Sequence, residues 1–195
     1  RVLEDLRQPL EDGRVTVSRS AMSAVFPSAF MLVAAMNPCE DVFRGLGVAK
    51  GGCTDSEKAR YYSRISGPLL DRIDIQLEVP EVKFRDIVSR EPAESSAAIR
   101  ARVTAARARQ LARFNGRKTY ANAQMGPRDI KRHCAIPAEA EKLLEMAVTR
   151  LGFSARAYDR VLKVARTISD LEGTDGITAA HVSEAIQYRL MDRHF

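Results

Sequence analysis

The feature of the sequence that most constrains the fold is an unbroken apolar run over residues 30–36, which ends at Asn37 and Pro38. Apolar runs without polar alternation are typical of central parallel strands that are covered on both faces. In open α/β sheets, ligands bind beyond the carboxyl ends of such strands. The run therefore predicts a buried strand that presents the side chain of Asn37 at a ligand-binding edge.

Two further segments alternate between apolar and polar residues, as half-exposed strands do. One covers residues 14–18 and follows a turn at residues 11–13. The other covers residues 73–79. Together with the apolar run, these segments make residues 1–80 an α/β region.

The composition changes between Pro80 and Pro92, and the sequence beyond them reads as helical. Hydroxyl side chains before the apolar stripes suit helix N-caps, and glycines after the stripes suit left-handed helix ends. The caps are Ser95 or Ser96, Ser154 and Thr178, and the ends are Gly116, Gly152 and Gly173. The expected fold class is thus α/β plus all-α, with an all-helical domain in residues 81–195.

A basic excess is the main signal in the composition. The formal net charge is +6 and the pI is about 9.5, which favours an anionic partner. Many of the cations gather in one part of the helical region: Arg100, Arg102, Arg107, Arg109, Arg113, Arg117, Lys118, Arg128, Lys131 and Arg132. These cations fit either a nucleic-acid contact or a solvated helix face. The sequence does not decide between the two, because no aromatic residues for base stacking are interleaved among the cations.

The cysteines and the apolar segments bear on the compartment. Three cysteines do not suggest a secreted disulfide framework, so we expect reduced thiols. No apolar run reaches the roughly 18 residues of a membrane span and no signal segment opens the chain, so we expect a cytoplasmic protein without membrane contact. We expect no metal site, because Cys39 and Cys53 offer two thiolates where structural zinc normally takes four ligands.

Five segments, in this order, resemble AAA+ ATPases of the magnesium-chelatase group, and most closely its ComM/YifB branch. They are residues 2–13, 35–39, 64–74, 165–171 and 184–189. The resemblance implies that residues 1–80 are the C-terminal half of a AAA+ parallel-sheet core, and that residues 81–195 are its helical lid. The sequence contains no Gly-x-x-x-x-Gly-Lys-Ser/Thr phosphate loop and no strand ending in Asp-Glu, which lie upstream in the resembled group. Members of the group commonly show two close cysteine pairs. This chain has one cysteine of each pair, Cys39 and Cys53, and lacks the other.

The resemblance also implies roles for three polar residues at the nucleotide. Asn37 occupies the sensor-1 position, where a carboxamide contacts the terminal phosphate and orients the attacking water. Arg72 matches the arginine finger that a neighbouring subunit inserts in trans, and Arg64 is a second candidate for that interface. The alternatives are a turn-forming Asn37 before proline and a local ion pair of Arg72 with Asp71 or Asp74.

Arg156 matches the sensor-2 position, and its place in the sequence independently favours a nearby anion. With Ser154 as the N-cap, Arg156 lies in the first helical turn, where the helix dipole disfavours a cation by roughly 0.3 to 1 kcal/mol unless an anion is near. Arg160 lies one turn later on the same face and is a second nucleotide-binding candidate. The alternative for Arg156 is an exposed ion pair with Asp159 or Asp170.

Arg19 is expected near the tip of a hairpin that resembles the channel hairpin of related ring helicases, and it is the candidate DNA contact. The implied activity of the intact protein is ATP hydrolysis, with ATP and Mg²⁺ as cofactors. In this reading a ring, expected to be a hexamer, couples hydrolysis to DNA translocation or branch migration in recombination or natural transformation. The present chain alone is expected to be inactive. The alternatives are a magnesium-chelatase-type subunit that drives metal insertion, and a non-catalytic DNA-binding or scaffold module.

Overall fold

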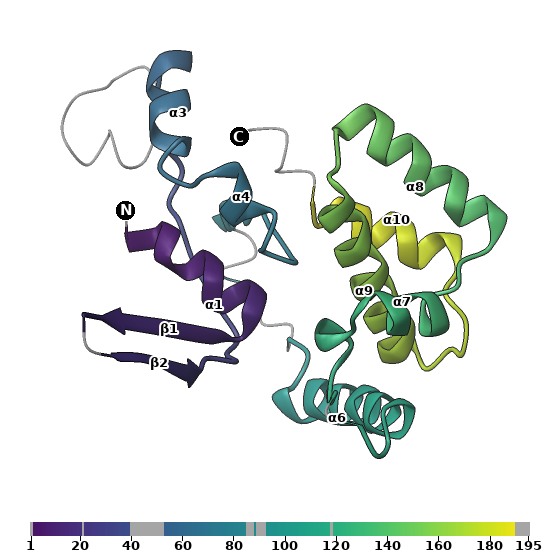
Figure 1. Ribbon diagram of the computed structural model, residues 1–195. Helices are drawn as coiled ribbons and strands as arrows, with labels where there is room; N and C mark the ends of the chain where they lie inside the picture. Colours follow the sequence, from purple (N-terminus) through teal and green to yellow (C-terminus); the bar gives the residue numbers. More distant parts are fainter. Residues whose placement is uncertain are drawn as a thin grey trace. The chain divides into compact units, whose positions relative to one another are not determined.

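The computed structural model describes residues 2–20, 22–39, 53–84, 88, 93–117 and 119–189. The chain divides into two compact units, one of residues 1–73 and 192–195 and the other of residues 74–191 (Figure 1). None of the helices in the described ranges is both long and apolar enough to cross a membrane.

The first unit begins with a helix and a hairpin. A 3₁₀ turn, η1 (Val2–Leu6), runs directly into α1 (Arg7–Asp12). Gly13 ends α1 in the left-handed region with a φ of 63°, which a residue with a side chain adopts only with strain. β1 (Arg14–Arg19) then pairs with β2 (Met22–Pro27) in antiparallel register along its whole length. This pairing confirms the first of the two alternating strands and the hairpin predicted there.

The apolar run over residues 30–36 is not a buried strand in this structure. It has no regular secondary structure, and the side chains of Met31 and Val33 are 86% and 81% exposed. A central strand needs hydrogen-bonded neighbours on both sides. The described strands, β1 and β2, pair with each other and leave no partner for the run. The predicted strand is therefore wrong for this structure, because nothing described lies beside the run to pair with it.

The strand predicted over residues 73–79 is wrong for the same reason. The segment is irregular, and Leu77 and Val79 are 63% and 84% exposed. Residues 74–79 belong to the second unit, where a backbone hydrogen bond from the Gln76 N–H to the Tyr188 carbonyl, at 2.8 Å, joins the segment to the end of the last described helix. Within the described residues the expected parallel-sheet core is thus absent, and the structure is mostly helical with one small antiparallel sheet.

Two short helices complete the described part of the first unit. α3 (Asp55–Tyr62) begins after Thr54, which forms a capping box with Glu57. α4 (Gly67–Leu70) begins after Ser66, whose hydroxyl accepts a hydrogen bond from the backbone of the first turn. The two helices bury three side chains, Tyr61, Leu69 and Leu70.

The second unit is helical, as predicted. In chain order it contains α6 (Ser96–Arg113), the 3₁₀ turn η2 (Asn122–Gln124), α7 (Pro127–His133), α8 (Ala138–Leu151), α9 (Ala155–Glu172) and α10 (Ala179–Gln187). The predicted caps and left-handed ends are present at Ser95, Ser154, Thr178, Gly116, Gly152 and Gly173. α9 lies centrally, in contact with α6, α7, η2 and α10, while α8 packs on α10 (Figure 1).

The apolar core forms where α8, α9 and α10 meet. Leu144, Val161 and Val182 are fully buried there, one from each helix. Full burial of an aliphatic side chain of this size stabilises the folded state by roughly 1.5 to 3 kcal/mol. The apolar stripes read from the sequence therefore account for how these three helices pack.

A charged cluster lies inside the same bundle. Asp170 of α9 is 2% exposed and accepts hydrogen bonds from Arg113 at 2.8 and 2.5 Å, from Asn122 at 2.8 Å and from Arg166 at 3.1 Å. Burial alone would raise the pKa of Asp170, but the hydrogen bonds from Arg113 and Asn122 and the two guanidinium charges outweigh it and lower the pKa. The cluster joins α6, η2 and α9 through a single carboxylate.

Candidate nucleotide and DNA contacts

Arg19 lies at the turn end of the hairpin, near its tip, as predicted. It forms the last pair of the sheet, opposite Met22, and its side chain is exposed. Within the described part of the chain Arg19 makes no hydrogen bond or ion pair. Behind it, the hydroxyls of Ser18 and Ser23 are hydrogen-bonded across the strands at 2.9 Å. The hairpin therefore presents one unneutralised guanidinium near its tip.

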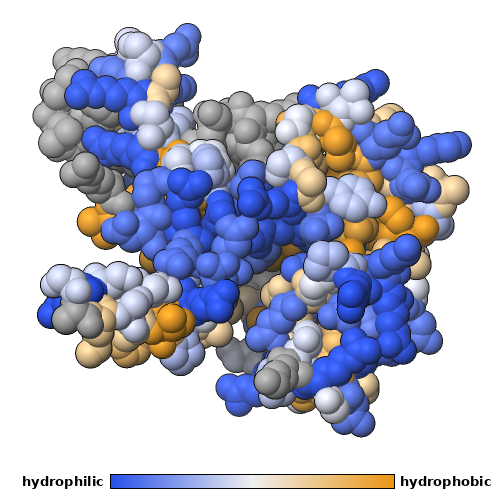
Figure 2. Space-filling model, in the orientation of Figure 1, coloured by the Kyte–Doolittle hydropathy of each residue, from blue (hydrophilic) through white to orange (hydrophobic). Residues whose placement is uncertain are grey.

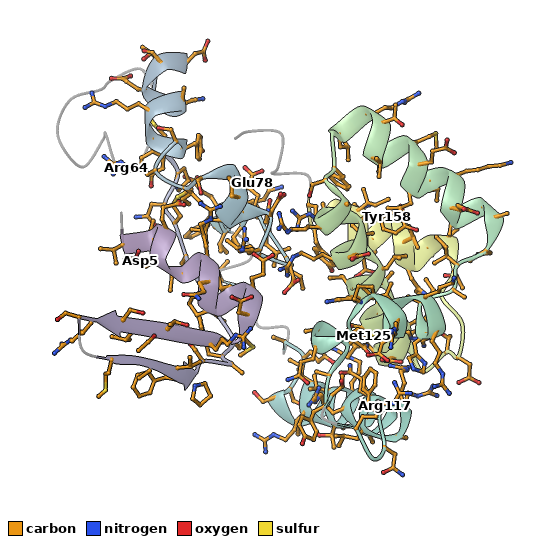
Figure 3. The ribbon with its side chains drawn as sticks, viewed as in Figure 1. Asp5, Arg64, Glu78, Arg117, Met125 and Tyr158 are labelled. Carbon is orange, nitrogen blue, oxygen red and sulfur yellow. A yellow bond between two sulfur atoms is a disulfide. The ribbon has the colours of Figure 1, made fainter. Side chains whose placement is uncertain are left out.

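Asn37 and Arg64 adjoin the same buried residue, Tyr61. The Tyr61 hydroxyl donates a hydrogen bond to the Asn37 carbonyl at 2.8 Å, which fixes the backbone of the predicted sensor position. The Arg64 guanidinium lies 5.5 Å from the centre of the Tyr61 ring, within the range of a cation–π contact. Arg64 extends from the chain just beyond α3 (Figure 3).

Sequence reasoning missed Tyr61. The one available signal was that α3 is strongly polar and that Tyr61 and Tyr62 are its aromatic residues. An aromatic side chain in a polar helix usually marks the side that is buried.

Arg72 is held inside the first unit. It is 9% exposed, its guanidinium forms an ion pair with Glu11 of α1, and it donates a hydrogen bond to the Pro68 carbonyl. Glu11 lies 61 residues away in the sequence, so local spacing does not indicate this pair. A role in trans requires Arg72 to exchange Glu11 for a phosphate on the neighbouring subunit.

Arg156 and Arg160 lie on α9, as the spacing predicts. Arg156 is exposed in the first turn, two residues after the cap Ser154. Arg160 forms an ion pair with Asp74. The alternative of an exposed pair between Arg156 and Asp170 is excluded, because Asp170 is buried in the cluster with Arg113 and Arg166.

Lys163 extends the basic face of α9 by one turn. It lies three residues after Arg160, and its ammonium donates a hydrogen bond to the Ala123 carbonyl at 3.1 Å. Burial lowers the pKa of Lys163, and the charge of Arg160 lowers it further. Arg156, Arg160 and Lys163 thus share one face, where a bound anion would relieve the repulsion between the cations. Sequence reasoning missed Lys163, although its spacing from Arg160 was visible.

The cysteines depart from the prediction of reduced thiols. Cys39 and Cys53 form a disulfide with their Cα atoms 6.3 Å apart, inside the range that a disulfide spans. Paired in this way, neither sulfur is a thiolate available to zinc. Cys134 is free and buried, and burial raises the pKa of its thiol to about 11. In the described ranges no group of three His, Cys, Asp or Glu side chains is placed to hold a metal ion.

The sequence pattern of the family described as "Magnesium chelatase, subunit ChlI" matches residues 1–87 of the chain. The pattern described as "Magnesium chelatase, subunit ChlI C-terminal" matches residues 93–189. The chain belongs to the magnesium-chelatase family. Its proteins are AAA+ ATPases, and the second pattern covers the helical unit described above.

Two relatives within the magnesium-chelatase family match over nearly the whole chain. The uncharacterized protein YifB of Escherichia coli (strain K12) is 41% identical over 200 residues, which cover 99% of this chain and 37% of that protein. Competence protein ComM of Haemophilus influenzae is 39% identical over 195 residues, with the same two coverages. The chain thus spans 37% of the length of these relatives.

Proposed function

We propose that this chain is the C-terminal part of a AAA+ ATPase motor that couples ATP hydrolysis to DNA translocation, with branch migration in recombination or natural transformation as its task. The proposal rests on two observations taken together: a hairpin that carries Arg19 near its tip, and 39% identity to a competence protein over 99% of the chain. A guanidinium near a hairpin tip suits phosphate groups, whose contact fixes position without reading sequence.

The nucleotide roles in this proposal follow the placement of the side chains. Asn37, with its backbone held by Tyr61, acts as sensor 1 at the terminal phosphate. Arg156 acts as sensor 2, assisted by Arg160, on the basic face of α9. Arg72 acts as the finger in trans, with Arg64 as a second candidate at that interface.

The residues present fit the phosphates of ATP but not Mg²⁺. The basic face of α9 offers three cations to a phosphate, whereas the described residues contain no cluster of carboxylates for a divalent ion. Bound ATP would supply the triphosphate whose terminal group is transferred to water. We therefore assign the metal ion no role at the residues of this chain. We propose that residues of the full-length protein outside this chain hold the metal ion.

The arrangement in this proposal is a ring, expected to be a hexamer, in which residues 1–80 face the neighbour and residues 81–195 form the lid. Since the finger acts on the next subunit, hydrolysis depends on assembly. The chain alone is expected to hydrolyse no ATP, because its sequence has no phosphate loop.

The proposal is tested on the full-length protein by ATPase rate and DNA affinity, measured for wild type, Arg19→Ala and Arg14→Ala. Arg14 is the matched control, because it is an exposed arginine at the opposite end of the same strand. Arg19→Ala should leave the basal ATPase rate unchanged and reduce its stimulation by DNA. The slope of log affinity against log salt should flatten by roughly 0.7 to 0.9, the effect of one lost phosphate contact. ATPase activity that DNA does not change in the wild type would contradict the proposal.

The family description favours one rival, a magnesium-chelatase-type ATPase subunit that drives metal insertion through a partner. Its ATPase rate would be indifferent to DNA. A non-catalytic DNA-binding or scaffold module, the second rival, would bind DNA in the same assay and hydrolyse no ATP. The two measurements therefore separate the three functions.

A further inference from the structure

We propose that the corner formed by the end of α6 and by α7 binds single-stranded DNA, with one base in a pocket against Tyr120 and the phosphates on the cations of α7. The inference rests on the proposed function in taking DNA as the ligand. The surface belongs to the second unit, whereas the hairpin that carries Arg19 belongs to the first.

A pocket of about 200 Å³ opens at the end of α6. Two aromatic residues line it, Phe114, which is 2% exposed, and Tyr120, which is 56% exposed. Arg117, which is labelled in Figure 3, also lines the pocket. Sites for whole drug-sized ligands measure roughly 300 to 1,000 Å³, so this pocket suits a single flat ring system.

α7 lies directly beside this pocket, joined to it by two contacts. Arg117 forms an ion pair with Asp129 of α7 at 2.7 Å. The Phe114 ring packs edge-on against the His133 ring, with the ring centres 5.8 Å apart. α7 therefore adjoins residues that line the pocket, and the surface over α6 and α7 is largely hydrophilic (Figure 2).

The exposed side of α7 carries three cations, Arg128, Lys131 and Arg132. Within the part of the chain that the structure describes, none of the three forms a hydrogen bond or ion pair. The one carboxylate of α7, Asp129, is already engaged by Arg117. The three charges are thus available to an anionic partner.

The environment of His133 reports the same excess of positive charge. Burial lowers the pKa of His133, and the charges of Arg113, Arg132 and Arg117 lower it further, while Asp129 opposes them. Cations therefore outweigh the carboxylate at the junction between α7 and the pocket. A polyanion docking here would meet a favourable potential.

An accessible aromatic ring beside backbone-tracking cations is the combination by which proteins bind single strands, since any base can stack on the ring. In the sequence, η2 separates Tyr120 from the cations of α7; in the structure, the pocket that Tyr120 lines is joined to α7 through Arg117 and Phe114. In a duplex the bases are stacked inside the helix and cannot enter the pocket. The pocket therefore selects a single strand, whereas the cations alone would accept either form.

The proposed contact between the cations of α7 and the DNA phosphates is tested first. The affinity of a fluorescent thymidine oligonucleotide for the full-length protein is measured over a salt series. Lys131→Gln/Arg132→Gln is compared with Lys142→Gln/Arg150→Gln, which removes one exposed lysine and one exposed arginine from α8. Two lost phosphate contacts should flatten the salt slope by about 1.4 in the first variant only. Equal slopes in the two variants would overturn the assignment of α7.

The proposed stacking of one base against Tyr120 is tested by comparing the DNA affinity of Tyr120→Leu with that of Tyr120→Phe, which keeps the aromatic ring. Because stacking of one base is lost, Tyr120→Leu should weaken binding of the single strand by roughly tenfold, whereas Tyr120→Phe should bind as wild type does. The affinity for a duplex of equal length should change little in either variant. Unchanged single-strand affinity in Tyr120→Leu, or an equal loss for the duplex, would overturn the pocket.

The same data separate this inference from the proposed function. A wild-type protein that binds no DNA refutes the DNA role altogether. A wild type that binds DNA, loses affinity through Arg19→Ala and is indifferent to the changes in α7 and Tyr120 refutes this inference alone.

Discussion

Replacing Asp170 by asparagine should be the most destabilising single conservative change in the helical unit. The carboxylate is 2% exposed and accepts four hydrogen bonds, two from Arg113 and one each from Asn122 and Arg166. Asparagine keeps the shape but removes the charge and turns one acceptor into a donor that faces guanidinium groups. Breaking a buried ion pair in this way costs about 3 to 5 kcal/mol, because the partner cations are left buried and uncompensated.

The assay is unfolding of the chain by urea at neutral pH, followed by the helical circular dichroism signal. Asp175→Asn is the matched control, because Asp175 pairs with Arg109 but its side chain is fully exposed, so its loss should cost less than about 1 kcal/mol. A loss of less than about 1 kcal/mol for Asp170→Asn would refute the reasoning, because the cluster would then contribute no more than a surface pair.

The pH dependence gives the same cluster a second signature. The pKa of Asp170 is lowered in the folded state, so its contribution is present above the unfolded value of roughly 3.9 and is lost as the pH falls through the folded value. Asp170→Asn should therefore be less sensitive to acid than the wild type between these two values. Parallel stability curves for the two proteins would contradict this part of the argument.

Three further outcomes are expected. In the full-length protein, Arg72→Ala should abolish ATP hydrolysis but spare nucleotide binding, and mixing with a phosphate-loop variant should restore activity; loss of folding without rescue would make the pair with Glu11 purely structural. Tyr61→Phe removes the hydrogen bond to the Asn37 carbonyl and should cost about 1 kcal/mol of stability. In the full-length protein it should lower kcat for ATP hydrolysis more than it changes KM, and equal effects on kcat and KM would argue against a positioning role. Cys134 should resist alkylation at pH 8 until the chain unfolds, because burial raises its pKa to about 11; rapid labelling of the native protein, read by mass spectrometry, would refute this.

The helical unit was predictable because its signals are local. Ser154 caps α9 through a hydrogen bond to the backbone of the first turn, and Gly173 ends the helix with a φ of 83°. Both effects act within a few residues of the chain, and the apolar stripe of α9 repeats at the helical period. Local chemistry therefore decides where such a helix begins and ends.

The strands were not predictable in the same way, because a strand depends on its neighbours. Residues 30–36 have the composition of a central strand, but the described residues supply no strand to pair with them. Residues 14–18 differ, because their partner β2 begins at Met22, close in sequence to the end of β1 at Arg19. The pairs of Arg72 with Glu11 and of Tyr61 with Asn37 were missed for a related reason, since 61 and 24 residues separate their members.

The basic residues of the helical unit form one cluster in the sequence. In the structure, some of them form contacts inside the fold and others are left exposed. Arg113 is committed to the buried cluster around Asp170, and Arg109 donates hydrogen bonds to the loop after α9. By contrast, Lys131 and Arg132 have no partner within the described ranges. Net charge therefore locates no interface by itself. Changing the committed arginines should reduce the stability of the unit, and changing the uncommitted cations should reduce DNA affinity at constant stability, because only the latter leave every contact inside the fold intact.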